Sequence, residues 1–182
     1  NLNDTMVIDV CTPLAGTYTI GTTGDYTDFN SAVADLNQCQ IDNPVVFNVQ
    51  PGTYAEYIRL IEVTGASATN TITFNGGDTS LVTITNDASV QPATIELEGA
   101  DYFTFKNMTI ENTGTIDAWG VHMQQDANFN VIDSNRIVME YFSGIYDVCP
   151  VVASNSETDD YSEGNNANNC VISNNTLIGG EM

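Results

Sequence analysis

The sequence of 182 residues has very few basic side chains, with three Lys and Arg (Arg59, Lys106 and Arg136) against 24 Asp and Glu. Its formal net charge is −21. Nucleic acids bind through basic residues that displace counterions, so this scarcity argues against nucleic acid as a partner. Anionic membrane surfaces and polyanionic polysaccharides are disfavoured for the same reason, unless a divalent cation bridges the charges. Neutral glycans, cations, basic proteins and surface proteins remain as candidate partners.

Long apolar runs are also lacking. No stretch approaches the roughly 20 apolar residues that a membrane-spanning helix needs, so membrane insertion is not expected. The sequence starts without Met and without a signal-peptide pattern, as expected of a mature secreted product.

Cysteine is scarce too, and its four positions form an even set without any C-x-x-C spacing: Cys11, Cys39, Cys149 and Cys170. We expect two disulfides, with sequence separations of 28 and 21 residues if each cysteine pairs with its neighbour along the chain, because a zinc site or a redox motif would need closer spacing. A disulfide framework in turn favours a location outside the cell. The alternative is four reduced cysteines in a cytosolic protein.

Short β-patterned segments recur along most of the chain. An apolar residue occupies a matching place in five of them, at intervals of 27, 31, 27 and 40 residues: Phe47, Phe74, Phe105, Ile132 and Ile172. Repeats of this length bury their apolar face only against the next repeat. Strands this short, with glycine, asparagine or aspartate at nearly every junction, favour parallel stacking over a sandwich. The sequence therefore predicts an all-β fold, a parallel β-helix solenoid.

Three regions follow from this pattern: an extended lead-in over 1–24, a helix within 25–42, and stacked turns over 43–182. Apolar residues at Phe29, Ala32, Val33 and Leu36 have helical spacing, and Thr27 is the expected N-cap. We expect this helix to cover one end of the stack. The other end stops on a strand pattern, so we expect the turns to continue in a longer polypeptide or to dock on another subunit.

Asparagine recurs near the repeat ends, at Asn107, Asn135, Asn174 and Asn175. If these residues align, their amides could hydrogen-bond from one turn to the next and satisfy the backbone at a bend. The alternative is ordinary turn asparagine, which tolerates positive φ.

The amphipathic helix, the strand VVFNV and the segment PGTYAEYIRL resemble the opening of right-handed parallel β-helix proteins of the pectin-lyase-like class. Within that class, GTYTIG, DYTDFNSAVADLN and ASATNTITFNG resemble β-helix domains of large secreted surface proteins of Bacteroidetes-type bacteria. The resemblance covers about residues 16–180. It implies a right-handed solenoid, export from the cell, and adhesive or gliding-related roles.

The resemblance also raises an enzymatic reading, because many members of the class act on acidic polysaccharides. Their lyase chemistry relies on basic residues near calcium, which this chain hardly offers. The related esterase chemistry uses aspartates and glutamines, for which Gln124, Gln125, Asp126 and Asp147 are only superficially suggestive. His122 alternates with apolar neighbours in WGVHM, so we expect it to face solvent.

The most acidic loop, SNSETDDYSEGNN, places Glu157, Asp159, Asp160 and Glu163 within seven residues. Calcium prefers such oxygen-rich loops, so these four residues are the candidate metal ligands and calcium the candidate cofactor. The spacing does not match an EF-hand, and the alternative is a solvated insertion.

Aromatic residues in two adjacent segments are the candidate glycan-binding residues: Trp119, Tyr141, Phe142 and Tyr146. Their rings could stack on sugars, although such residues more often pack in a core. No feature of the sequence completes an active site. Our first hypothesis is a noncatalytic β-helix module of a secreted or cell-surface bacterial protein, with an adhesive or structural role. The alternative is a polysaccharide-active enzyme, or a carbohydrate-binding fragment of one.

Overall fold

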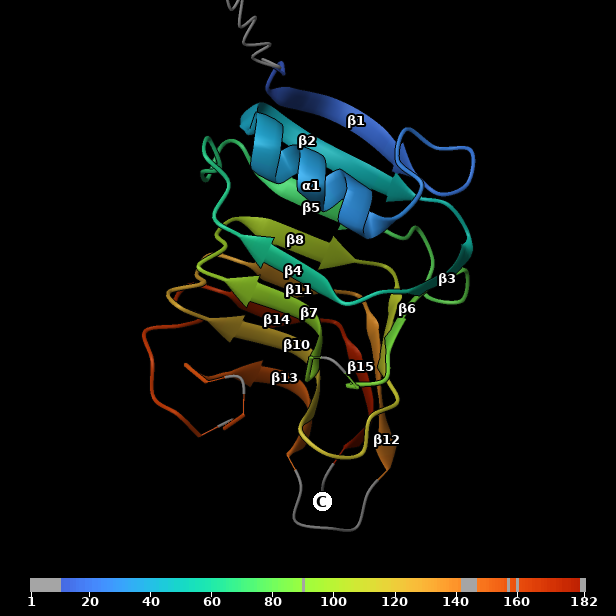
Figure 1. The fold of residues 1–182 in the computed structure, drawn as a ribbon, viewed down its shortest axis with the longest axis vertical. Coiled ribbons are helices and arrows are strands. Elements are labelled where there is room, and N and C mark those ends of the chain that lie inside the picture. Colours follow the sequence, from blue (N-terminus) through green and yellow to red (C-terminus); the bar gives the residue numbers. More distant parts are fainter. Residues whose placement is uncertain (1–10, 90, 142–146, 157, 160, 181–182) are drawn as a thin grey trace, which may run out of the picture.

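The computed structural model describes residues 11–89, 91–141, 147–156, 158–159 and 161–180. Within this part of the chain, the strands form three parallel sheets that wind around a common core, with one helix at one end (Figure 1). The elements are β1 (Leu14–Ile20), α1 (Phe29–Cys39), β2 (Ile41–Val49), β3 (Gly52–Ala55), β4 (Ile58–Ile61), β5 (Ile72–Asn75), β6 (Val82–Asn86), β7 (Ala93–Glu98), β8 (Phe103–Lys106), β9 (Thr109–Asn112), β10 (Ala118–Gln124), β11 (Val131–Asp133), β12 (Arg136–Tyr141), β13 (Val148–Ala153), β14 (Val171–Ser173) and β15 (Thr176–Gly180).

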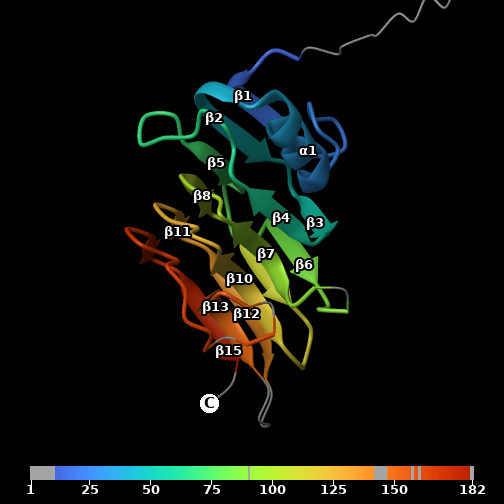
Figure 2. The same cartoon turned by 60° about the vertical axis from the view of Figure 1, so that its left-hand side comes forward.

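Each sheet is built from strands of successive turns. Sheet A has the order β1-β2-β5-β8-β11-β14, sheet B the order β15-β12-β9-β6-β3, and sheet C the order β13-β10-β7-β4. The named pairs in all three sheets are parallel. The predicted fold class, a parallel β-helix solenoid, is confirmed. Figure 2 shows the turns following one another from the α1 end to the β15 end.

The core is organised by a column of aromatic rings in sheet A. Neighbouring rings lie 4.9 Å apart for Phe47 and Phe74, and 5.0 Å for Phe74 and Phe105. The backbone register continues this column through Ile132 to Ile172. The alignment of repeats predicted from the sequence is therefore confirmed, and like residues stack on like residues in the interior.

Helix α1 closes one end of this core. Its ring of Phe29 lies 5.2 Å from that of Tyr54 and 5.7 Å from that of Phe74. Asp28 caps the helix, since its carboxylate accepts a hydrogen bond of 2.8 Å from the backbone N–H of Ser31. The predicted cap at Thr27 was wrong by one residue.

A disulfide joins Cys11 to Cys39, with their Cα atoms 5.3 Å apart. It ties the segment before β1 to the last residue of α1, and such a cross-link is consistent with an extracellular protein. No disulfide joins Cys149 to Cys170, so the second predicted bridge was wrong. The two residues belong to different sheets: Cys149 lies in β13 of sheet C, whereas Cys170 directly precedes β14 of sheet A.

Asparagines link successive turns at the corner between sheets A and B. The buried amide of Asn135 donates to the carbonyl of Phe105 over 2.8 Å and accepts from the N–H of Met108 over 3.2 Å. One turn later, Asn175 donates to the carbonyl of Ile132 over 2.7 Å and accepts from the N–H of Asn135 over 2.8 Å. Side-chain amides therefore satisfy the backbone where each turn bends.

The register of the predicted asparagine ladder differs by one residue. Asn107 and Asn174 share their place in the turn with Ser134, and all three have a positive φ of 55° to 57°. These two asparagines are thus left-handed turn residues, whereas Asn135 and Asn175 carry the ladder. The predicted ladder is therefore confirmed for Asn135 and Asn175, and the alternative of ordinary turn asparagines for Asn107 and Asn174.

The end of the stack opposite α1 exposes apolar side chains. About half of the surface of Ile172 and Leu177 is accessible, at 50% and 53%, although their counterparts in earlier turns are buried. In the described part of the chain, no helix is long and apolar enough to cross a membrane.

Candidate functional site

The outer face of sheet C carries the single histidine. Strand alternation turns His122 away from Val121 and Met123, as the sequence predicted, but the side chain is only 1% exposed. Its Nε2 lies 3.2 Å from the carbonyl and 3.1 Å from the hydroxyl of Ser154. The prediction that His122 faces solvent was therefore wrong, because the chain that follows β13 covers this face.

Burial also sets the charge of this histidine. Removal from water disfavours the imidazolium, which lowers the pKa of His122 to about 4. At neutral pH the ring is thus uncharged and enclosed. A general base must reach the proton that it abstracts, and this imidazole is enclosed by protein.

Carboxylates on the same face are engaged by neighbouring side chains. The amide of Gln124 donates to Glu96, which is buried. Glu98 forms an ion pair with Arg59 and accepts from the amide of Gln125 over 3.0 Å. These contacts run across β4, β7 and β10, and they hold the polar row of sheet C in place.

The two aspartates considered for esterase chemistry, Asp126 and Asp147, do not lie near each other. Asp126 follows the end of β10, whereas the carbonyl of Asp147 accepts a hydrogen bond from Ala118 at the start of β10. The strand between these points has seven residues. At about 3.3 Å per residue, Asp126 and Asp147 lie about 20 Å apart or more, too far to act on one bond.

Trp119 was expected at a glycan platform, but its side chain is fully buried against Ala93 and Val152. It presents no face to a sugar, so this part of the prediction was wrong. Tyr141 lies in β12 and only its backbone is described. Phe142 and Tyr146 lie outside the described residues.

The candidate calcium ligands are only partly described, because Glu157 and Asp160 lie outside the described residues. Asp159 accepts a hydrogen bond of 3.0 Å from the N–H of Tyr161, and Glu163 is exposed. Among the described residues, no three His, Cys, Asp or Glu side chains form a cluster that could hold a metal ion. Calcium binding stays a prediction.

A partly exposed aromatic pair lies at the corner between sheets C and A. The rings of Tyr102 and Phe129 stack with their centroids 5.0 Å apart and their planes at 9°. Phe129 is 40% exposed. Both residues occupy the same place in successive turns, directly before the inward residue that opens the sheet A segment.

The backbone of this pair is strained. Tyr102 has a φ of 64° and Phe129 a φ of 57°, a left-handed conformation that bulky residues rarely adopt. Each such residue costs about 1 to 2 kcal/mol relative to glycine. Asn169 holds the equivalent place in the next turn with a φ of 56°, as is usual for this conformation. Two rings therefore replace the residues that the turn itself prefers.

Polar groups run alongside these rings. Asp101 accepts a hydrogen bond of 2.7 Å from the N–H of Asn128, and Asn128 accepts one of 2.8 Å from the N–H of Asn168. Burial raises the pKa of Asp101, and the repulsion of Glu62 adds to this effect. The corner thus combines apolar rings with a row of hydrogen-bonding groups.

Sequence reasoning missed this pair, although a signal was present. Tyr102 and Phe129 each stand three residues before a member of the interior column, Phe105 and Ile132 respectively. An aromatic residue at this turn position in two successive repeats has no role in the core. The matching position was therefore the sign that these rings are presented outward.

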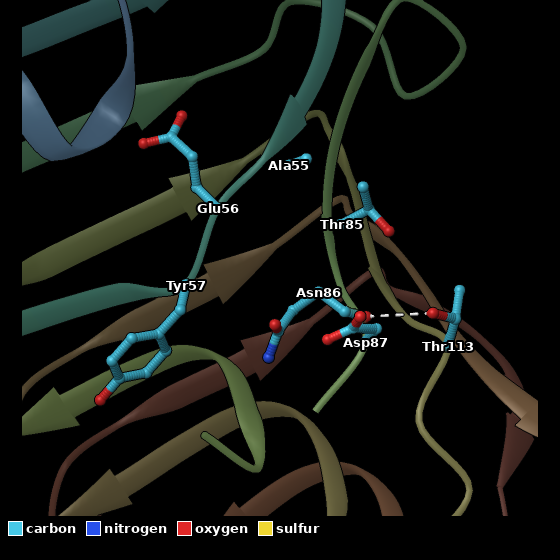
Figure 3. Close-up of a pocket in the computed structure, with 7 residues that line it drawn as sticks. All are labelled: Ala55, Glu56, Tyr57, Thr85, Asn86, Asp87 and Thr113. Atoms are coloured by element: carbon cyan, nitrogen blue, oxygen red, sulfur yellow. Dashed lines mark hydrogen bonds between the residues drawn. The ribbon is translucent and has the colours of Figure 1, made fainter. Parts of the chain in front are cut away.

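A hollow of about 240 Å³ opens at the corner between sheets B and C (Figure 3). It lies where β3, β6 and β9 end, so three successive turns supply its lining: Ala55, Glu56, Tyr57, Thr85, Asn86, Asp87 and Thr113. Its volume is below the roughly 300 to 1,000 Å³ of pockets that enclose drug-sized ligands. A single sugar ring or a short side chain suits such a space better.

Two carboxyls line this hollow, and their pKa values move in opposite directions. Burial raises the pKa of Glu56, whereas hydrogen bonds from Ser89 lower that of Asp87. The Glu56 carboxylate accepts from the N–H groups of Phe29 over 3.2 Å and Asn30 over 2.9 Å. In Figure 3 it points toward the helix and away from Asp87. Glu56 therefore holds the start of α1 rather than facing a ligand beside Asp87.

The comparisons with known proteins identify no family. No protein-family model matches the chain, and no curated protein matches it. Among solved structures, the chain is similar to the pectin methylesterase from Aspergillus niger in its deglycosylated form, with 16% identity and a TM-score of 0.43. The similarity covers 94% of this chain and 86% of that one. At this level it says nothing about activity.

Proposed function

We propose that this chain is a noncatalytic, adhesive β-helix module of a secreted or cell-surface bacterial protein, of the kind that its sequence resembles, and that it binds neutral glycans. The observation that supports this most is the partly exposed stack of Tyr102 and Phe129, held in strained backbone beside a polar row. Strain of this kind concentrates at functional sites.

The chemistry of the corner suits sugars without charge. Aromatic rings bury the apolar faces of a sugar, and neighbouring carboxylate and amide oxygens accept its hydroxyl protons. The net charge of −21 repels polyanions at long range and leaves neutral chains unaffected.

The test is a binding panel of neutral oligosaccharides, such as cello-, xylo-, malto- and manno-oligosaccharides, followed by calorimetry and backbone NMR. Phe129→Ala is expected to weaken binding about tenfold, since a well-placed aromatic contact contributes roughly 0.5 to 1.5 kcal/mol beyond the area it buries. Ile116→Ala is the control, because Ile116 is 56% exposed and lies between β9 and β10, at the corner between sheets B and C. Equal binding by both variants, or no binding to the panel, would contradict the proposal.

Titrations with calcium and with chelator belong to the same experiment, since the acidic loop of residues 157–163 is our proposed calcium site. Specific calcium binding predicts a higher melting temperature with calcium than with magnesium at equal ionic strength. Asp159→Asn combined with Glu163→Gln should remove that difference.

A second candidate function is polysaccharide cleavage at the hollow of Figure 3. Glu56 is bonded to the start of α1 and points away from Asp87, so the hollow does not present the facing pair of carboxyls that a glycosidase uses, and cleavage is the weaker candidate. Release of reducing ends from the same panel, abolished by Asp87→Asn, would establish cleavage. Binding without turnover favours the adhesive module.

A further inference from the structure

A second hollow, larger than the first, lies on the outer face of sheet B and has a volume of about 450 Å³. This volume falls within the roughly 300 to 1,000 Å³ typical of small-molecule sites. Its lining consists of hydroxyl residues, one carboxylate and one cation: Thr53, Thr79, Ser80, Thr83, Thr109, Glu111 and Arg136. It is formed by β3, β6, β9 and β12 with the segment before β6, so it is separate from the Tyr102 and Phe129 corner.

The cation in this hollow has no partner in the described part of the chain. Arg136 makes no ion pair and no hydrogen bond through its guanidinium with any described residue. By contrast, Arg59 is paired with Glu98, and Lys106 lies in register with Asp133 and contributes to lowering the pKa of that carboxyl. In a chain with 24 acidic residues, a guanidinium without a carboxylate partner is unusual.

Glu111 lies near Arg136 without pairing with it. The register places Arg136 opposite Thr109 and Glu111 opposite Val138, so the two charged residues are diagonal neighbours on adjacent strands. Glu111 lines the same hollow yet does not reach ion-pair distance. The five N–H groups of Arg136 therefore remain available to a ligand.

The hydroxyls of the hollow form a row that leads to this cation. Thr53, Thr83, Thr109 and Arg136 follow one another across β3, β6, β9 and β12 in direct register. Thr109 donates its proton to the carbonyl of Thr79 over 2.8 Å and keeps its lone pairs. Thr53 and Thr83 make no side-chain hydrogen bond with a described residue, so both can donate and accept.

From this arrangement we infer that the hollow on sheet B binds a sugar unit that carries one anionic group, either a carboxylate or a sulfate ester. The planar guanidinium of Arg136 pairs with two oxygens of the anion, and the threonine row bonds the sugar hydroxyls. The net charge of −21 and Glu111 both disfavour a continuous polyanion, so the anionic unit stands among neutral ones. This inference does not rest on the glycan corner proposed above.

NMR titration of the ¹⁵N-labelled protein tests the site with four probes. Methyl β-glucuronide and glucose 6-sulfate carry the two anions, methyl β-glucoside is the neutral match, and acetate is an anion without a ring. We expect the two charged sugars to shift the Arg136 Nε–Hε signal and the Thr53 and Thr83 amides, and to bind more tightly than the other two probes. If only one charged sugar binds, that result assigns the anion.

Substitutions then locate the interaction. Arg136→Gln should weaken binding of the charged sugars about 10- to 100-fold, as expected for hydrogen bonds to a charged group. The affinity of Arg136→Lys should fall between those of the wild type and Arg136→Gln, because lysine keeps the positive charge but lacks the planar, two-pronged donor geometry of the guanidinium. Arg59→Gln, which removes a cation from sheet C, is the matched control and should leave binding unchanged. Equal binding of glucoside and glucuronide, acetate binding as tightly as the charged sugars, or an unaffected Arg136→Gln variant would each overturn the inference.

Discussion

At the scale of single residues, burial decides what the titratable groups of this protein can do. His122 illustrates this most clearly, since its ring sits against Trp119 and Ser154 with almost no exposed surface. A buried imidazole of low pKa is a structural group whose protonation works against folding.

His122 should make the protein less stable in mild acid. Its pKa is about 4 in the folded state and about 6.5 when unfolded, so the unfolded chain binds the extra proton between these values. The stabilisation is complete above about pH 6.5, is lost as pH falls toward 4, and amounts to about 3 kcal/mol. Urea unfolding of the wild type and of His122→Gln at pH 7 and pH 4.5 measures it. Parallel pH dependence of the two proteins would contradict the assignment.

Residue burial could be predicted from the sequence where it depends on strand alternation and the repeat, but not where it depends on contacts with residues far along the chain. Phe47, Phe74 and Phe105 were predictable because strand alternation and a fixed repeat place them inward. The burial of His122 was not, because Ser154, which covers it, lies 32 residues further along. Trp119 was misplaced for a similar reason, since Val152 of a later strand packs on it.

At the scale of elements, helix α1 and strand β1 together form the cap of the solenoid. The helix was predictable from the spacing of its apolar residues. Its capping box, in which the side chains of Asp28 and Ser31 each accept a hydrogen bond from the other residue's backbone N–H, was not predicted. The disulfide between Cys11 and Cys39 then fixes the lead-in to the helix end. The cap is thus the one element of the described chain with a covalent tie of this kind.

Reduction should therefore act on the cap alone. Closing a loop of 28 residues stabilises by about 3 to 4 kcal/mol in the chain-entropy description, so dithiothreitol should lower the free energy of unfolding by that amount. Cys11→Ser should show the same loss and no further response to reductant. Cys170→Ser serves as the control and should respond as the wild type does. A Cys11→Ser variant that still responds would reveal a second disulfide.

At the scale of the whole molecule, the solenoid is asymmetric along its axis. One end is closed by α1, whereas the other exposes Ile172 and Leu177. The stacked fold could be predicted from the repeat intervals, because each turn needs a neighbour to bury its apolar face. The two hollows could not be predicted, since they combine residues of three or four turns whose side-chain directions depend on the corners.

An aspartate substitution should reduce the free energy of unfolding much more at Ile132, inside the sheet A column, than at Ile172, at its exposed end. Ile132→Asp places a charge at a site that is 1% exposed, and should cost more than about 4 kcal/mol or prevent folding. Ile172→Asp affects a side chain that is 50% exposed, and should cost less than about 1 kcal/mol. Urea unfolding compares them. A large loss for Ile172→Asp would mean that self-association covers this end, which sedimentation would detect.

The disulfide between Cys11 and Cys39 has a mechanical consequence. If a tethered ligand pulled on this protein, the hydrogen bonds between turns would break one strand pair after another. While the disulfide is intact, such a force cannot extend the segment between Cys11 and Cys39, so these residues stay joined even after the turns around them separate.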